Sequence, residues 1–115
     1  MSFRKKIGLR GEDLACKWLT LKNYEILARN FRCRGGEIDV VAQHEREIVF
    51  IEVKTRQNDR FGFPEEAVDN SKLLKIKKAA EVFIDKNNLF DHSARIDVIA
   101  ILGKKIRHII DVASF

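Results

Sequence analysis

The chain has 115 residues, enough for one domain built around one modest core. Its 22 Lys and Arg residues outnumber 17 Asp and Glu residues, and the net charge of +5 favours a polyanionic partner, nucleic acid first. No apolar run approaches the roughly 20 residues of a membrane span. Charged residues follow the basic N-terminus where a signal peptide would be apolar, so we expect a cytoplasmic protein that does not bind membranes.

The first half of the chain predicts one helix and three strands. Residues 5 to 22 repeat apolar side chains at helical spacing. Residues 24 to 33 have strand composition in part, and Gly35 and Gly36 form a turn after them. Two further runs have strand composition, from about Glu37 to Gln43 and from about Glu47 to Thr55.

The second half predicts a loop, a helix and two strands. The loop covers residues 56 to 66, and the helix covers residues 70 to 88 with Asn70 or Ser71 as its N-cap. Two more strands are expected, at residues 94 to 102 and 105 to 113. The order α-β-β-β-α-β-β predicts a single α/β domain over the whole chain, with a mixed sheet flanked by helices.

The hairpin at residues 37 to 55 carries charges where a core strand would carry valines. Side chains alternate along a strand, so Glu52 and Lys54 share a face with Phe50. The other face of that strand is apolar, which is typical of a central strand buried on both sides. Charged side chains in such a strand are costly unless they have partners.

The register of this hairpin predicts what those partners are. A turn at Glu45–Arg46 would place Asp39 opposite Glu52, with Cβ atoms about 5 Å apart, and Glu37 opposite Lys54. Two carboxylates at that distance repel unless one is protonated or a cation lies between them, so we expect at least one raised pKa. Carboxylate oxygens suit Mg²⁺. A longer loop would shift the register, and Glu37 with Lys54 could form a simple ion pair.

Glu12 has two interpretations. At helical spacing it lies on the border of the buried face of the first helix, from which it could turn toward the acids of the hairpin. It could instead stabilise the first turn of the helix by interacting with the helix dipole.

Asp39, the segment Glu52-x-Lys54 on the next strand and the helical Glu12 together resemble the PD-(D/E)xK nuclease superfamily, which includes restriction endonucleases and Holliday-junction resolvases. The segments "RGEDLACKWL", "GGEIDVVA" and "IVFIEVKTR" resemble the YraN-like family of small bacterial proteins, and the resemblance extends from about residue 8 to residue 115. It implies a restriction-endonuclease-like core. Ile38 stands where the superfamily pattern has a proline, which takes no chemical part.

The resemblance implies a catalytic role for Glu12, Asp39, Glu52 and Lys54. Asp39 and Glu52 would bind Mg²⁺ or Mn²⁺, which would activate a water molecule and neutralise charge on the scissile phosphate. Lys54 would orient that water or stabilise the developing charge. Glu12 would hold a second metal or the water shell of the first. Glu37 would orient Lys54.

Four basic residues and one threonine around these acids are predicted to contact nucleic acid. The predicted contacts are Arg34, Thr55, Arg56, Lys72 and Lys75. The lysines are equally compatible with a solvated helix face. The implied activity is metal-dependent cleavage of phosphodiester bonds in DNA, including branched or structured DNA. The alternative is a non-catalytic nucleic-acid-binding or adaptor module with the same fold. A homodimer is compatible with cutting both strands.

Overall fold

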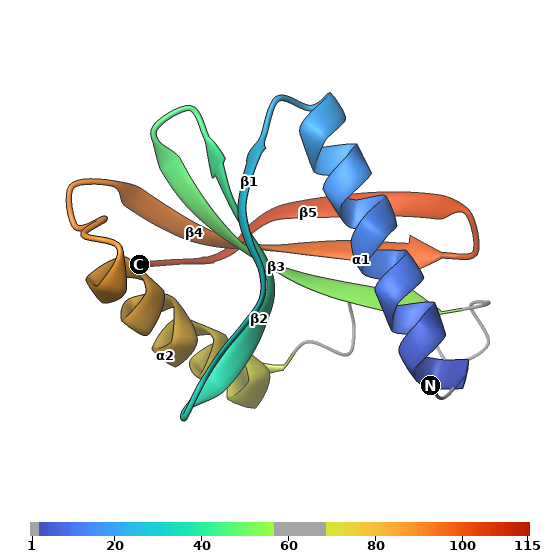
Figure 1. The fold of residues 1–115 in the computed structure, drawn as a ribbon, viewed down its shortest axis with the longest axis horizontal. Coiled ribbons are helices and arrows are strands. Elements are labelled where there is room, and N and C mark those ends of the chain that lie inside the picture. The colour runs from blue at the N-terminus through green and yellow to red at the C-terminus, as the bar shows by residue number, and fades with distance from the viewer. Residues whose placement is uncertain (1–2, 57–68) are drawn as a thin grey trace.

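Five strands form one sheet that carries a helix on each face (Figure 1). The computed structural model describes residues 3–56 and 69–115, with side chains from Arg10 onward apart from Ser114. The helices are α1 (Phe3–Leu21) and α2 (Asn70–Lys86), and the strands are β1 (Glu25–Cys33), β2 (Gly36–His44), β3 (Glu47–Arg56), β4 (Ser93–Leu102) and β5 (Lys105–Ser114). The predicted order of elements is confirmed. The predicted loop lies outside the described residues, apart from Arg56.

The sheet is mixed, as predicted. Its strand order is β1-β2-β3-β4-β5, with β3 and β4 parallel and every other pair antiparallel. The parallel pair follows from the position of α2, because parallel neighbours need a crossover connection. The C-terminal ends of β3 and β4 therefore lie at one edge of the sheet, together with the β1–β2 and β4–β5 turns.

The predicted register of the β2–β3 hairpin is confirmed as far as Val40 and Ile51, whereas the predicted pairs Asp39–Glu52 and Glu37–Lys54 lie beyond the paired residues. His44 pairs with Glu47, and the ladder continues to Val40 opposite Ile51. The next positions along the two strands are Asp39 and Glu52, where the paired ladder ends.

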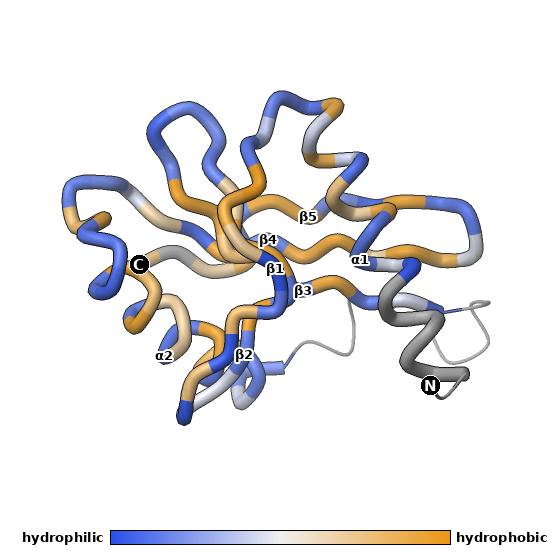
Figure 2. Tube along the Cα trace, viewed as in Figure 1, coloured by the Kyte–Doolittle hydropathy of each residue, from blue (hydrophilic) through white to orange (hydrophobic). Residues whose placement is uncertain are grey.

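The side chains of β3 divide the core into two layers. Val49 and Ile51 pack in the layer under α1, whereas Ile48 and Phe50 pack in the layer under α2. Figure 2 shows apolar residues along β3, β4 and β5. Continuing the alternation, Glu52 lies on the α2 face, directly after an unbroken run of buried residues.

The N-cap of α2 is Asp69, so the expectation of Asn70 or Ser71 is wrong by one or two residues. The Asp69 carboxylate accepts a hydrogen bond from the backbone N–H of Lys72 at 2.9 Å. The carboxylate is the stronger acceptor for the free N–H groups of the first turn, and its charge interacts favourably with the helix dipole. This cap fixes the turn that carries Lys72.

α1 crosses β3 at very close range. A Cβ atom on Gly11 would lie 2.2 Å from Cγ2 of Thr55, so only glycine fits there. This contact brings the middle of α1 against the end of β3 that carries the charged residues.

The opposite end of the sheet contains a buried polar network. Asp97, which is fully buried, accepts hydrogen bonds from Arg95 Nε at 2.9 Å, from His108 Nε2 at 2.7 Å and from the backbone N–H of Asp111 at 2.9 Å. Arg95 also donates to the Tyr24 hydroxyl at 2.7 Å. Burial alone would raise the pKa of Asp97, but these bonds together lower it. We did not predict this network.

Among the described helices, neither is long and apolar enough to span a membrane.

Candidate functional site

Asp39 reaches across to β3 at the point where the strand pairing ends. Its Oδ2 accepts a hydrogen bond from the backbone N–H of Val53 at 2.8 Å. The carboxylate thus takes the place of a main-chain acceptor and lies against the segment that contains Glu52 and Lys54. The predicted proximity of Asp39 to this segment is therefore present in the structure.

Glu52 is a buried acid with two cationic partners. It is 4% exposed, and its Oε1 lies 3.2 Å from Nζ of Lys54 and 3.0 Å from Nζ of Lys72. A buried carboxylate is tolerated only with such partners. Burial alone would lower the pKa of Lys72, but its interactions with Glu52 raise that pKa. Lys72 is therefore held in its charged form.

The environment of Asp39 disfavours its charged form. Burial and the negative charge of Glu52 raise the pKa of Asp39 to about 7, although the hydrogen bond from Val53 acts in the opposite direction. Glu12 and Glu37 add smaller contributions of the same sign as Glu52. The expectation that one acid of the pair has a raised pKa is met by Asp39.

Glu12 lies in the interior of α1, because the helix begins at Phe3. The interpretation as a first-turn dipole partner is therefore excluded. The Glu12 side chain is 13% exposed, and its Oε2 is buried without a hydrogen-bond partner among the described residues. The nearest cation is Arg29, whose Nη2 is 3.7 Å from Glu12 but only 2.8 Å from Asp13. Glu12 thus has an unsatisfied oxygen in the neighbourhood of Asp39.

Glu37 does not contact Lys54 in the structure. Its carboxylate lies 3.1 Å from Nε of Arg32, on the neighbouring strand β1. The alternative interpretation of the charged hairpin as a Glu37–Lys54 ion pair is therefore wrong, since Lys54 pairs with Glu52 instead. Glu37 acts on the site only through its charge.

The donors fit a hard cation only in part. Asp39 and Glu52 supply carboxylate oxygens, and Mg²⁺ is commonly bound by one or two carboxylates with several water molecules. The described residues contain no group of three or more His, Cys, Asp or Glu side chains that converge closely enough to hold a metal ion. The structure thus presents a carboxylate pair for one cation, with Glu12 outside direct ligand distance.

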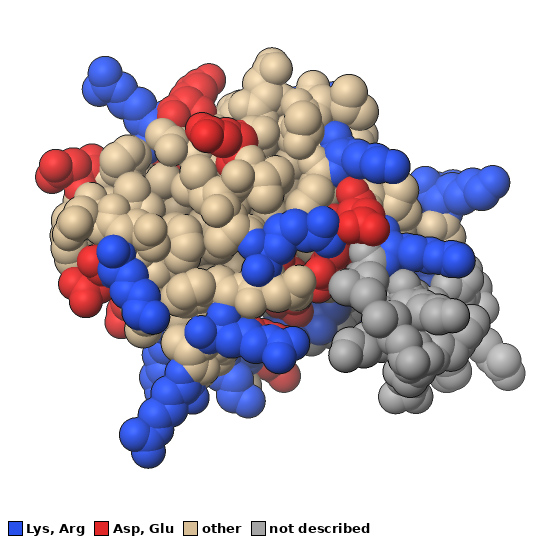
Figure 3. Space-filling model, viewed as in Figure 1, with Lys and Arg blue, Asp and Glu red and all other residues tan. Residues whose placement is uncertain are grey.

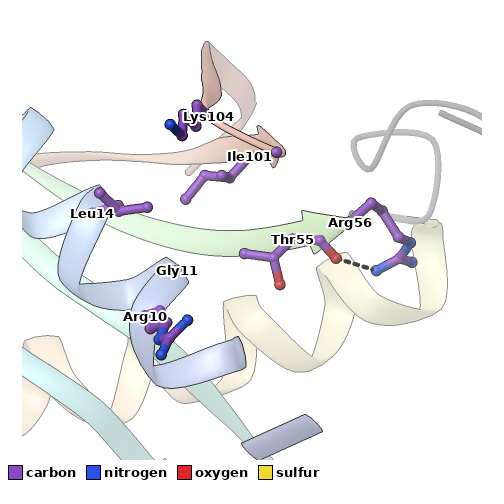
Figure 4. Close-up of a pocket in the computed structure, with 8 residues that line it drawn as sticks. Arg10, Gly11, Leu14, Thr55, Arg56, Ile101 and Lys104 are labelled. Carbon is purple, nitrogen blue, oxygen red and sulfur yellow. Dashed lines mark hydrogen bonds between the residues drawn. The ribbon is translucent and has the colours of Figure 1, made fainter. Parts of the chain in front are cut away.

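The predicted nucleic-acid contacts divide into two groups. Arg34, Lys72 and Lys75 line a cavity of about 420 Å³ between the β1–β2 turn and the start of α2. Figure 3 shows basic side chains projecting where these two elements meet. Thr55 and Arg56 line a different cavity of about 330 Å³, which also includes Arg10 and Lys104 (Figure 4). Both cavities open at the edge of the sheet that carries Asp39 and Glu52.

Sequence reasoning missed two features of this edge. Lys72 was expected only as a nucleic-acid contact, and its bond to Glu52 depends on how α2 packs over β3. Arg10 and Lys104 were not singled out. A signal for Lys104 exists in its position at a tight turn that follows a strand parallel to β3, because such strands end at the same edge.

The architecture defines a small α/β domain that is consistent with a restriction-endonuclease-like core. The chain belongs to the uncharacterised protein family UPF0102, whose model matches residues 11–101. This is the family of the YraN-like proteins that the sequence resembles. The matched range includes Glu12, Asp39 and Glu52 together with both lysines that contact Glu52.

Close relatives occur in several bacteria. A UPF0102 protein of Geobacter sulfurreducens is 48% identical over 97 residues, which cover 84% of this chain and 76% of the relative. One of Syntrophomonas wolfei is 47% identical over 111 residues, covering 93% and 96% respectively. One of Caldanaerobacter subterraneus is 45% identical over 98 residues, covering 85% and 80%. These names state the family and no activity.

Proposed function

We propose that this protein is a metal-dependent nuclease that hydrolyses phosphodiester bonds in DNA. The observation that carries the proposal is the pair of Asp39 and Glu52, where burial and mutual repulsion raise the pKa of Asp39 to about 7. A pair that repels in this way has a deficit of positive charge between its members. Perturbed carboxylates beside lysines are typical of sites that bind a cation and a phosphate.

Asp39 and Glu52 would hold the cation. Bound Mg²⁺ would lower the pKa of a water molecule and neutralise charge on the scissile phosphate. Asp39 is oriented for this role by its hydrogen bond from Val53, which leaves Oδ1 without a protein donor among the described residues. The buried Oε2 of Glu12 is placed to accept a hydrogen bond from a water molecule in this neighbourhood.

Lys54 and Lys72 would serve the phosphate. Both ammonium groups lie within 3.2 Å of the same oxygen of Glu52. When that oxygen binds a cation, the two lysines lose part of their partner's charge and become available to phosphate oxygens. Lys54 comes from β3 and Lys72 from α2, so the two lysines approach the site from different elements.

A second candidate is a non-catalytic module that binds nucleic acid. One observation favours it: Glu52 already has two lysine partners, and no third acidic side chain converges on the described pair. A site neutralised by its own lysines needs no metal to be stable. Both candidates predict binding of nucleic acid, and they differ in hydrolysis.

The deciding experiment is cleavage of labelled single-stranded, duplex and branched DNA by the purified protein in Mg²⁺ or Mn²⁺, with EDTA as the metal-free control. The variant is Asp39→Asn, and the matched control is Asp91→Asn, an exposed aspartate outside the site. Cleavage that is lost in Asp39→Asn and in EDTA but kept in Asp91→Asn supports the nuclease. Tight binding with no cleavage in either metal identifies the binding module. Absence of both cleavage and binding overturns both candidates.

A further inference from the structure

The cavity of about 330 Å³ lies between α1, the end of β3 and the β4–β5 turn. Its lining combines two apolar side chains, Leu14 and Ile101, with three cationic ones, Arg10, Arg56 and Lys104. No acidic residue is among the described residues that line it. It begins at Thr55, the residue after Lys54, so it adjoins the site of the Asp39–Glu52 pair.

The apolar part of the cavity is formed from two elements that meet over β3. Leu14 projects from α1 and Ile101 from β4, and the two side chains point toward one another (Figure 4). Leu14 is 39% exposed, which leaves a large apolar surface in contact with water beside a charged site. Because Gly11 has no side chain, α1 can approach the Thr55 side chain of β3 closely.

The cationic part has few partners within the protein. Arg56 donates from Nη1 to the carbonyl oxygen of Thr55 at 2.8 Å. The side chains of Arg10 and Lys104 make no hydrogen bond or ion pair with other residues in the described part of the chain. Three positive charges around an apolar wall, two of them without an ion-pair partner among the described residues, suit a ligand with one anionic and one apolar part.

We propose that this cavity binds a single unpaired nucleotide of a nucleic acid strand. Its base lies against Leu14 and Ile101, and the phosphates on its two sides lie against the cationic groups at the rim, Arg10, Arg56 and Lys104. This assignment rests on the proposed function, which places the cleaved phosphate beside Lys54. The cavity volume is at the small end of the ~300–1,000 Å³ range of small-ligand sites, so it holds one such group and no helix.

The occupant defines a substrate class. In a duplex the bases are stacked and paired, and moving one into a side cavity requires breaking both interactions. An unpaired nucleotide enters without that cost and gains contact with apolar side chains and arginine planes. The preferred substrate is therefore single-stranded DNA, or DNA with an unpaired nucleotide beside the cut.

Binding measured in EDTA tests this assignment separately from cleavage. The probes are a fluorescent single-stranded oligonucleotide and a blunt duplex of equal length, followed by anisotropy across a range of salt concentrations. Wild-type protein should bind the single strand more tightly. Lys104→Ala should weaken single-strand binding about fivefold at 0.1 M salt and reduce the logarithmic salt slope by about 0.7, the value for one phosphate contact. The matched control is Lys105→Ala, which removes the same charge one residue away, outside the cavity lining.

The apolar wall is tested by Leu14→Ser. It should weaken single-strand binding about fivefold, the lower end of the effect of losing one stacking contact, with the salt slope unchanged. Leu21→Ser is the control, because Leu21 is 79% exposed on the same helix and lies outside the lining. Thermal melting of each variant tests whether the fold is retained.

Three results would overturn the assignment. The first is an equal loss of affinity in Lys104→Ala and Lys105→Ala, which would indicate diffuse electrostatic attraction. The second is equal affinity of wild type for single strand and duplex. The third is binding of thymidine monophosphate as tight as that of the oligonucleotide, which would assign the cavity to a free nucleotide. Binding that depends on Lys104 but is not followed by cleavage would support the cavity assignment and overturn the nuclease proposal. Cleavage with binding that does not depend on Lys104 would support the nuclease proposal and overturn the cavity assignment.

Discussion

The carboxylate of Asp39 accepts a hydrogen bond from the backbone N–H of Val53 at 2.8 Å, beyond Val40 and Ile51, the last paired residues of the β2–β3 ladder. The main chains of the two strands therefore separate where the acidic side chains begin. A side chain that replaces a main-chain acceptor is held in one orientation by that hydrogen bond. This geometry is the basis of the predictions on Asp39.

Asp39 makes metal-free stability depend on pH. A folded pKa near 7, against about 3.9 in the unfolded chain, means that the folded state binds the proton more tightly. The contribution is fully present below pH ~4 and is lost as pH rises through ~7. Wild type in EDTA should therefore be less stable at pH 8 than at pH 5, by at most ~3 kcal/mol, since about two pKa units separate pH 5 from the folded pKa. Urea unfolding at both pH values measures this difference.

Asp39→Asn should remove most of that pH dependence and leave stability at pH 8 equal to or above that of wild type. Asparagine keeps an acceptor for Val53 and has no charge to repel Glu52. Strong destabilisation of Asp39→Asn at pH 8 would identify Asp39 as a structural ion-pair partner and contradict the site.

Mg²⁺ should stabilise the folded protein. The gain follows RT ln(1 + [Mg²⁺]/Kd), since the unfolded chain has no assembled site. At pH 5 the gain in stability should be smaller, because the proton competes with the cation for the Asp39 carboxylate. Thermal melting with and without millimolar Mg²⁺ gives the shift, with Asp91→Asn expected to keep it and Asp39→Asn to abolish it. If Mg²⁺ does not shift the melting temperature of the wild type alone, the comparison is repeated with a non-cleavable oligonucleotide present. Absence of a Mg²⁺-dependent shift in that experiment contradicts the metal site.

Glu12→Gln and Asp13→Asn form a matched pair on α1. Both side chains lie near Arg29, but only Glu12 has a buried oxygen without a hydrogen-bond partner. Glu12→Gln should reduce cleavage about 10- to 100-fold, as for groups that orient metal-bound water. It should also lower the pKa of Asp39, because it removes one of the charges that raise it. Asp13→Asn should change neither, since its ion pair is exposed. Equal effects of the two substitutions would remove Glu12 from the site.

Gly11→Ala should destabilise the fold. Alanine normally favours a helix over glycine by up to ~1 kcal/mol, but its methyl group would lie 2.2 Å from Cγ2 of Thr55. Overpacking of this kind costs about 1–3 kcal/mol. Thr55→Ser removes the opposing methyl group, so the double variant should recover part of the loss. A double-mutant cycle by urea unfolding measures the coupling, and additive losses would show that α1 and β3 do not meet as described.

The elements and the hairpin register were predictable because they depend on local patterns. Alternation along β3 and the short turn before it place Asp39 beside the Glu52 segment without knowledge of the rest of the fold. The pairing of Lys72 with Glu52 was not predictable in this way, because it requires the position of α2 on the sheet. Residue type alone does not identify Asp69 as the N-cap, because Asn70 and Ser71 are equally favoured at that position.

The network around Asp97 and the cavity beside Leu14 were missed for a related reason. Arg95 and Asp97 alternate with apolar residues as any half-buried strand does, and His108 is distant in sequence. Only the antiparallel pairing of β4 with β5 brings them together. The cavity likewise combines residues from α1, β3 and the β4–β5 turn, which no short segment contains.

The Asp97 network gives the two ends of the sheet different resistance to local opening. It joins β4 and β5 through satisfied hydrogen bonds and extends to Tyr24, so separating the strands there exposes a buried charge. At the other end, opening relieves repulsion between acids. Amide hydrogen exchange should therefore be slow at Asp111, whose N–H is bonded to Asp97, and faster at Val53, whose N–H is bonded to Asp39. We therefore expect the sheet to open first at the end that carries Asp39, while the hydrogen bonds of Asp97 keep β4 and β5 paired.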